Sequence, residues 1–531
     1  MKRGFSPQRR PYAAAAGLLT LTLTLAACSG SSSGSGSGSG SDDELRLAIS
    51  AEMPTLDPET VYQVEGNQVL SAAYEGLLQY SPDSSDKIVP MLAESYDISK
   101  DGLTYTFHLR DDVTFAGGRT MTSKDVQASF ERLAEPKVES QMAYMVADVD
   151  GYQTPDASTF VLDLKAPSSA FLSLVASPFG PKVIDSDVLT KYQADHALGY
   201  LKEHTAGTGP YQLASLTAGQ EYDLKRTAGY WGGEPAFASV SVKVISDVAT
   251  QLLQLQGGDL DVVSAQPVAT LKQFAGNPDF QVVQFPTLQK ADLHVKTTGT
   301  LSDPKLREAL RDSIDRSSLV SRVWGDYAKV STQMYPAGMV PEGTSTDTWQ
   351  TSTGASTTLA TLAKGKKITL GYIAGNTADK QAAEGLQAQW ASAGVDVELT
   401  VVQGNDVYGL SSSLSTAPDL LFEKAYPDSA HPDTWARLFW YSDPAKGNGA
   451  LNYLGGGTKA ADAAIDAGAA ATDQATIDAD YAQAGDDIHA DVSYITLADI
   501  QDAFIMSKDL TGAGHWLPEP MTLDLRTLKR N

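Results

Sequence analysis

The 531-residue sequence has a single cysteine, Cys28, so no disulfide can form within one chain. Lysine and arginine are scarce as well: 40 of them stand against 65 aspartates and glutamates, which leaves a net charge of −25. Nucleic-acid binding needs a basic face, and the sequence has no cluster of basic residues to form one. Acidity of this kind keeps an exported protein soluble. We therefore expect neither a disulfide framework nor a nucleic-acid partner.

Recognisable catalytic patterns are also missing. The sequence has no His-Glu-x-x-His, no G-x-x-x-x-G-K-[ST] loop and no G-x-G-x-x-G before a helix. His196 and His204 have acidic neighbours, but the seven histidines are scattered, and solvated surface histidines explain this pattern better than a metal site does. We predict no catalytic residue, no metal and no cofactor. A secreted hydrolase is the weaker alternative, because it would need a nucleophile or an acid–base set that the sequence does not offer.

The N-terminus has the layout of an export signal. Four cations precede the apolar segment 13–27, which is shorter than the roughly 20 residues of a membrane-spanning helix. Its last residues, Leu25-Ala26-Ala27-Cys28, resemble a bacterial lipobox, in which the cysteine is acylated. We predict a lipoprotein signal peptide over 1–28 with Cys28 as the lipid attachment site; an ordinary signal with an incidental cysteine is the alternative. The protein would be exported and anchored by lipid to the outer face of the cytoplasmic membrane.

The residues after the cysteine predict a tether and then a folded chain. Residues 29–41 are nothing but serine and glycine, a flexible coil with a reach of about 20 Å. The clearest folded unit is 366–402, where alternating apolar residues, a helical stripe and a second alternating run predict a βαβ unit. Residues 460–484 are rich in alanine and aspartate and predict one surface helix. The mixed order of elements predicts an α/β or α+β class with several lobes.

Aromatic residues gather near two breaks in the pattern. Tyr230 and Trp231 form one group, and Tyr426, Trp435 and Trp440 belong to the other. Aromatic side chains bury a large area and also present flat walls to ligands. For each of them, ligand contact and inter-lobe core are both open interpretations.

Residues 88–132 closely resemble the signature region of the extracellular solute-binding proteins, family 5, the peptide- and nickel-binding receptors of ABC importers. The likeness continues in Pro54–Pro58, Tyr74–Leu77, Gly207–Tyr211 and Tyr230–Gly232. Further matches occur in the same order at 255–261, 306–316 and 383–398. The resemblance thus spans nearly the whole mature chain.

The resemblance implies an α/β, two-lobed periplasmic-binding-protein-like fold of type II, with an extra domain and a hinge between the lobes. By analogy, lobe I comprises 42–72, 205–285 and 495–531, the additional domain 73–204, and lobe II 286–494. It implies no enzyme activity. The expected partners are a small solute and an ABC permease in the membrane, and we expect the protein to be a monomer.

The resemblance also indicates where a ligand binds. The segments matching Glu52-Met53-Pro54 and 422–432 line the cleft in the family. Oligopeptide receptors carry an aspartate for the peptide ammonium where this chain has Ala425, so Glu423 or Asp428 must serve instead, or the ligand is not a free peptide N-terminus. The predicted ligand-binding residues are Glu52, Met53, Pro54, Tyr230, Trp231, Glu423, Tyr426, Asp428, Trp435 and Trp440.

The predicted function is therefore the substrate-binding lipoprotein of an ABC importer, with an oligopeptide as the favoured solute. Sugars and metal chelates are alternative ligands on the same fold. A chemosensor or adhesion lipoprotein on this fold stays open as well.

Overall fold

The computed structural model describes residues 43–81, 84–349, 351, 353–443, 451–516 and 518–531. The signal peptide, its Cys28 and the Ser/Gly tether lie outside the described residues, and those predictions stay untested by the structure. Within the described part, no helix has the length and apolar character that crossing a membrane requires.

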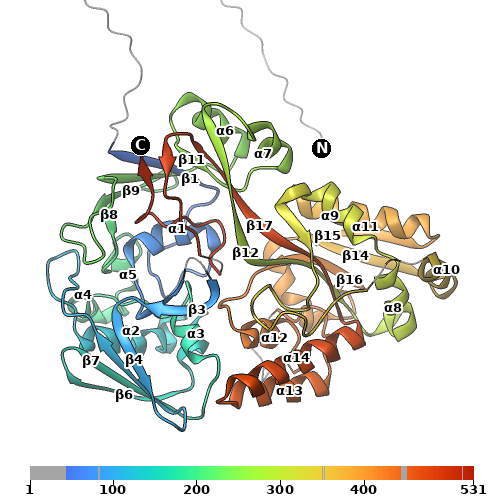
Figure 1. Ribbon diagram of the computed structural model, residues 1–531, viewed down its shortest axis with the longest axis horizontal. Coiled ribbons are helices and arrows are strands. Elements are labelled where there is room, and N and C mark those ends of the chain that lie inside the picture. The colour runs from blue at the N-terminus through green and yellow to red at the C-terminus, as the bar shows by residue number, and fades with distance from the viewer. Residues whose placement is uncertain (1–42, 82–83, 350, 352, 444–450, 517) are drawn as a thin grey trace, which may run out of the picture. The chain divides into compact units, whose positions relative to one another are not determined.

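One large mixed sheet organises the fold, with the strand order β15-β14-β16-β12-β17-β11-β1-β10-β9-β8 (Figure 1). We call its two ends lobe I and lobe II. The strands of lobe I are β1 (Glu44–Ile49), β8 (Tyr211–Thr217), β9 (Glu221–Arg226), β10 (Ser239–Val244) and β11 (Val262–Val263). The strands of lobe II are β14 (Lys367–Ile373), β15 (Asp396–Val402) and β16 (Leu420–Ala425). The long strands β12 (Phe280–Val295) and β17 (Tyr494–Ser507) belong to both lobes, and β13 (Ala328–Val330) pairs with β17.

The strands β12 and β17 connect the two lobes as an antiparallel pair (Figure 1). Their register shifts between Pro286 and Lys290, and a bulge of this kind bends and twists a strand. Lys290 points into the interior here, with its side chain 1% exposed, and its Nζ lies 2.8 Å from Asp499 Oδ1 on β17. The bend between the lobes is therefore held by a buried ion pair.

Lobe II contains the predicted βαβ unit. Helix α11 (Thr377–Ser392) connects β14 to β15, which pair in parallel, and Asn376 caps its N-terminus. The prediction of one surface helix over 460–484 is wrong. The structure has α13 (Lys459–Ala470) and α14 (Gln474–Asp491), because Asp473 accepts from the amide of Thr476 and starts a second helix.

A separate antiparallel sheet of order β4-β5-β7-β6 forms the part that we call the additional domain. Its strands are β4 (Ala93–Ile98), β5 (Thr104–Leu109), β6 (Val149–Asp156) and β7 (Thr159–Leu164), and α2 (Ser123–Leu133) packs on it. Thr122 and Asp125 form a capping box at the N-terminus of α2. Phe130 of α2 is fully buried 5.3 Å from the ring of Phe160, and burial of such a side chain contributes about 1.5–3 kcal/mol.

Buried charges tie the additional domain to lobe I. Arg132 of α2 binds Asp57 and Glu59, at 2.5 Å in each case, and all three side chains are at most 5% exposed. Burial raises the pKa of Glu59 to about 8, against the effect of Arg132.

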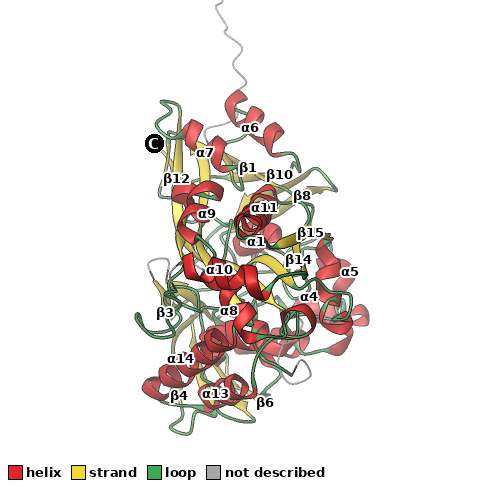
Figure 2. Ribbon diagram, turned by 90° about the vertical axis from the view of Figure 1, so that its right-hand side faces the viewer, coloured by secondary structure: helices red, strands yellow, loops and turns green. Residues whose placement is uncertain are grey.

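On its other side the additional domain meets lobe II. The backbone amide of Ser169 donates to the carbonyl of Ala469 at 2.9 Å, and Ser169 Oγ donates to the carbonyl of Gly468. Figures 1 and 2 both show α13 and α14 beside β4 and β6. One apolar cluster accordingly contains Phe130 of the additional domain together with Trp435 of lobe II.

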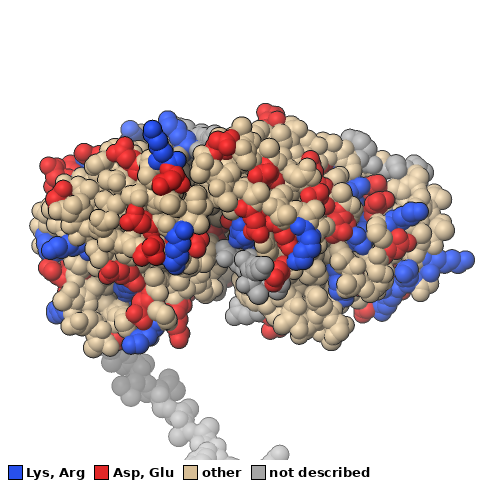
Figure 3. Space-filling view, turned by 90° about the horizontal axis from the view of Figure 1, so that it is seen from below, with Lys and Arg blue, Asp and Glu red and all other residues tan. Residues whose placement is uncertain are grey.

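The remaining elements complete the lobes and their connections. They are α1 (Val64–Ala73), β2 (Leu78–Ser81), β3 (Ser84–Pro90), α3 (Phe171–Val175), α4 (Ser186–Lys191), α5 (Leu198–Leu201), α6 (Val248–Gly257), α7 (Val268–Phe274), α8 (Pro304–Asp312), α9 (Arg316–Val323), α10 (Thr353–Leu362), α12 (Pro432–Phe439), β18 (Leu510–Thr511) and β19 (Lys529–Arg530). Asp247 caps α6. Acidic and basic side chains are interspersed on the face seen in Figure 3.

Candidate functional site

Strand β12 carries a stripe of ionisable side chains on one face in lobe II. Lys290, Asp292, His294 and Lys296 alternate with three apolar residues, and alternate residues of a strand share a face. Each of the four is at most 7% exposed. The apolar residues of the opposite face pack into the core of lobe II. Burying four ionisable groups costs free energy unless hydrogen-bond or charge partners compensate for the lost hydration. The partners of these four side chains therefore indicate the role of this face.

Asp292 and His294, the middle residues of this stripe, have a tyrosine and a carboxylate as their respective partners. His294 Nε2 lies 3.1 Å from Glu423 Oε2 on β16, and Tyr453 donates to the other oxygen of Glu423 at 3.0 Å. Tyr494 donates to Asp292 Oδ2 at 2.8 Å, while the buried Oδ1 of Asp292 has no hydrogen-bond partner among the described residues. Burial raises the pKa of Asp292 well above its ordinary value.

Asp428 is the point where the three parts of the fold converge. Its side chain accepts from Tyr62 Oη of lobe I at 2.5 Å and from Tyr144 of the additional domain. The residue is 1% exposed, and among the described side chains no lysine, arginine or histidine forms an ion pair with it. Burial raises the pKa of Asp428, and the two tyrosine hydrogen bonds oppose this rise. A buried carboxylate therefore stands at the junction of the lobes without a cation.

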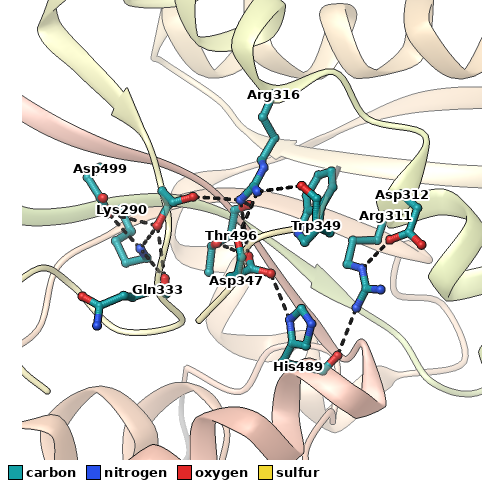
Figure 4. Close-up of polar contacts among 11 residues, drawn as sticks. Lys290, Arg311, Asp312, Arg316, Gln333, Asp347, Trp349, His489, Thr496 and Asp499 are labelled. Carbon is teal, nitrogen blue, oxygen red and sulfur yellow. Dashed lines mark hydrogen bonds and ion pairs between the residues drawn. The ribbon is translucent and has the colours of Figure 1, made fainter. Parts of the chain in front are cut away.

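The hinge end of the same face differs, because its charges are paired. Figure 4 shows Lys290 with Asp499, and Asp347 between Arg316 and His489. Asp347 lies 3.5 Å from Arg316 NH1 and 2.9 Å from His489 Nδ1. These pairs hold β12, α9, α14 and β17 together.

Three of the resembling motifs meet at Glu75, which lies where the additional domain borders lobe I. This fully buried carboxylate accepts from Thr208 Oγ1 at 2.8 Å, from Tyr230 Oη at 2.5 Å and from Trp231 Nε1 at 2.9 Å. The predicted ligand residues Tyr230 and Trp231 thus direct their polar atoms to Glu75. Neither is among the side chains bonded to Asp428. Burial raises the pKa of Glu75, which the three hydrogen bonds oppose.

The structure places the other predicted ligand residues in three settings. Glu52 and Pro54 are exposed, and the buried Met53 donates its amide to Tyr222 Oη at 2.9 Å. Trp435 and Trp440 are at most 1% exposed and belong to the aromatic core around Tyr494, although their indole nitrogens have no partner among the described residues. Tyr426 stacks on Phe179 of the additional domain with ring centroids 6.3 Å apart. Glu423 lies beside the ionisable stripe of β12, whereas Asp428 and Tyr426 contact the additional domain.

Sequence reasoning missed several residues of this face. Asp292 and His294 had a visible signal, because ionisable residues alternate with apolar ones along 290–296. Tyr62, Tyr144 and Tyr494 had none, since each is one tyrosine among 22 and reaches its carboxylate only through the tertiary fold.

Two lobes joined by two long strands, with a buried carboxylate at their junction, form an arrangement suited to a solute-binding protein. Comparison with known proteins agrees with this class. The family of bacterial extracellular solute-binding proteins, family 5 (middle region), matches residues 87–447, and the chain belongs to that family. Membership confirms the prediction of a binding protein and not an enzyme.

Two curated relatives cover part of the chain. The chain is 33% identical over 305 residues to the probable D,D-dipeptide-binding periplasmic protein DdpA of Escherichia coli K12, which covers 57% of this chain and 58% of that protein. It is 30% identical over 292 residues to the glutathione-binding protein GsiB of Salmonella typhi, covering 55% and 56%. The aligned region thus spans little more than half the length of these relatives.

Two solved structures share the fold over nearly the whole chain. The periplasmic binding protein DppA of Helicobacter pylori in complex with the peptide STSA has a TM-score of 0.77 at 22% identity, covering 92% of this chain and 98% of that chain. NikZ of Campylobacter jejuni in complex with Ni(L-His) has a TM-score of 0.77 at 20% identity, covering 92% and 100%. The predicted periplasmic-binding-protein-like fold is confirmed.

Proposed function

We propose that this protein is the substrate-binding lipoprotein of an ABC importer, which captures a peptide-like solute with a positive amine between its lobes and delivers it to a membrane permease. Family membership and the dipeptide and glutathione named for its relatives support this proposal. The single observation that supports it most is Asp428, a buried carboxylate at the junction of the lobes that has two tyrosine partners and, among the described residues, no cation.

The chemistry of Asp428 suits an ammonium group. An isolated carboxylate is costly to bury, and a ligand ammonium would supply the missing charge through a charge-assisted hydrogen bond. Asp428 lies three residues after Ala425, the position at which the resemblance places the amine-binding aspartate of oligopeptide receptors. Asp428 would therefore take over that role in this chain.

The contacts of Asp428 also suit closure on a ligand. Tyr62 and Tyr144 reach Asp428 from the other two parts of the fold, so this arrangement exists only when the lobes are together. A ligand that binds such a composite site shifts the population toward the closed form. A sugar or a metal chelate does not need the ammonium partner, so we rank both below a peptide.

Calorimetric titration of the purified protein with matched peptides tests the ammonium contact. We expect free di- and tripeptides to bind and their N-acetylated forms to bind weakly or not at all. The substitution Asp428→Asn should weaken peptide binding by about 10- to 100-fold, because a hydrogen bond to a charged group is worth roughly 1.5–3 kcal/mol. Glu398→Gln, at an exposed ion pair of β15, is the matched control and should bind as the parent protein does.

Equal binding of free and acetylated peptides would refute the role of Asp428. Binding of sugars or of nickel–histidine, with no response to any peptide, would reverse the choice of substrate. Unchanged thermal unfolding of Asp428→Asn is the check that a loss of binding is not a loss of folding.

The lipid anchor rests on the sequence alone and needs its own experiment. Cys28→Ser should move the protein from the membrane fraction to the soluble fraction, because the thiol that carries the lipid is gone, whereas Ser29→Ala should leave it on the membrane. Persistent membrane association of Cys28→Ser would show that the lipobox interpretation is wrong.

A further inference from the structure

A cavity lies apart from Asp428, which is not one of its lining residues. It has a volume of about 60 Å³ and lies between α1, β2, the loop 176–182 and the C-terminal residues Trp516, Pro518, Glu519 and Arg526. Its described lining residues all lie outside 286–494, the stretch that contains β14, β15 and β16. The cavity therefore lies on one side of the junction of the two lobes. Its volume exceeds the 10–15 Å³ that a single water needs, so it has room for a small organic molecule.

Several polar groups in its wall have unused bonding capacity. Asn67 is 3% exposed, and its Nδ2 has no hydrogen-bond partner among the described residues; the buried Nε1 of Trp516 has none either. Lys182 Nζ donates a single hydrogen bond, to the carbonyl of Ser177 at 3.1 Å. Glu519 is 6% exposed, and within the described part of the chain its carboxylate has no hydrogen bond and no ion pair. Unsatisfied polar groups around one cavity call for a polar occupant.

The other charges of the wall are satisfied, which isolates these groups. Glu75 accepts the three hydrogen bonds described above, and Arg526 is paired with Asp524 at 2.8 Å. Among the described residues, Lys182 and Glu519 form no ion pair, although their opposite charges attract each other across the cavity wall. The amide nitrogen of Asn67 and the indole nitrogen of Trp516 have no hydrogen-bond partner there. Apolar side chains such as Leu70 and Met91 make up much of the rest of the wall. The wall is suited to a molecule with a charge of each sign and a small apolar part.

We propose that this cavity binds a small free α-amino acid, with its carboxylate on Lys182, Asn67 and Trp516 and its ammonium on Glu519. Burial supports the assignment: it lowers the pKa of Lys182 to about 8 and raises that of Glu519 to about 7. Both groups thus lose solvation that a zwitterion would replace. This site goes beyond the proposed import function, because it is separate from Asp428.

The wall of the cavity is also in contact with lobe II. Tyr80 lines it and accepts from the backbone amide of Ala430 at 3.0 Å, and Phe179 lines it and stacks on Tyr426. Ser177, whose carbonyl accepts from Lys182, donates its Oγ to the carbonyl of Asp428. An amino acid in the cavity would therefore stabilise the closed arrangement of the lobes. Since coupling between two sites is reciprocal, peptide and amino acid would strengthen each other's binding.

Ligand-detected NMR and calorimetry on the purified protein test this site with L-alanine as the probe. We expect a dissociation constant of about 1 mM or lower for L-alanine, with acetate and ethylamine, which carry one charge each, binding at least tenfold more weakly. Glu519→Gln and Lys182→Met should each weaken L-alanine binding at least tenfold. Saturating L-alanine should tighten the binding of a dipeptide to the parent protein.

Asp428→Asn separates this inference from the proposed function, because it should lose peptide binding and keep L-alanine binding. No L-alanine binding by a protein that binds peptides would overturn the inference alone. Equal binding of acetate and L-alanine, or unchanged binding by Glu519→Gln, would show that the cavity does not recognise a zwitterion. Glu519→Gln keeps the shape of the side chain, so it serves even if Lys182→Met does not fold.

Discussion

Two sets of buried carboxylates in this protein differ in how they are satisfied. In lobe I and the additional domain, Asp57 and Glu59 bind Arg132, and Glu75 accepts three hydrogen bonds. In lobe II, Asp428 has two tyrosine donors and no cation among the described residues, and one oxygen of Asp292 has no partner there. These two sets of carboxylates are equally buried but differ in whether the described side chains satisfy them.

The contrast is informative because burial is costly in both places. A carboxylate enclosed with arginine recovers its lost hydration from that partner, and removing the partner destabilises the fold. A buried carboxylate without a cationic partner has lost its hydration without compensation. A cationic ligand can supply the missing interaction. Substitutions in the first set should therefore lower stability, and those in the second should change binding or pH dependence instead.

The largest expected effect is at Arg132. Arg132→Met should lower the free energy of unfolding by about 3–5 kcal/mol, because it leaves Asp57 and Glu59 buried without their cation. Urea denaturation measures the change. Arg226→Met is the matched control, since its partner Glu234 is 74% exposed, and it should cost less than about 1 kcal/mol. Similar losses for the two variants would remove the distinction between the regions.

A smaller loss is expected at the Glu75 cluster. In Glu75→Gln, one carboxylate oxygen becomes an amide that cannot accept, so one of the three donors loses its acceptor. The cost should be about 1–3 kcal/mol in the same denaturation assay. The exposed Glu94→Gln should change stability by no more than about 0.5 kcal/mol. A neutral Glu75→Gln would mean that these hydrogen bonds do not stabilise the fold.

The smallest effect, expressed as the change in unfolding free energy per pH unit, is expected at Asp292. Burial raises its pKa, so the folded state binds this proton more tightly than the unfolded state, and stability falls as pH rises from about 4 through the raised pKa. Asp292→Asn removes this dependence. Denaturation curves between pH 4 and pH 8 should therefore diverge in favour of Asp292→Asn, by at most about 1.4 kcal/mol per pH unit. If stability changed with pH in the same way for Asp292→Asn and the parent protein, the prediction would be contradicted. The control is the exposed Asp279→Asn, whose stability should change with pH as that of the parent protein does.

Local patterns predicted the elements well where one periodicity held. The predicted βαβ unit over 366–402 is present, because short-range geometry decides it. The prediction of a single helix over 460–484 is wrong. It was based on composition, which does not show that Asp473 caps a second helix. The predicted domain boundaries stay a prediction.

The predicted ligand residues lie in different parts of the fold, and their role stays a prediction. The resemblance indicated Glu423 and Asp428; Glu423 contacts His294 of β12, and Asp428 contacts Tyr62 at the junction of the lobes. Tyr230 and Trp231 instead direct their polar atoms to Glu75, which aromatic clustering along the sequence could not show. Whether the predicted residues contact a ligand awaits the peptide titration.

By itself, the sequence determined the family, the order of the elements and the excess of acidic residues, because these are properties of composition and local pattern. Only the tertiary structure decided which buried carboxylates are satisfied. Tyr62 and Asp428 are 366 residues apart, and no local pattern encodes a partner at that separation. Whether a buried charge is satisfied within the fold depends on such distant partners, and the packing of the two lobes and the additional domain brings them together.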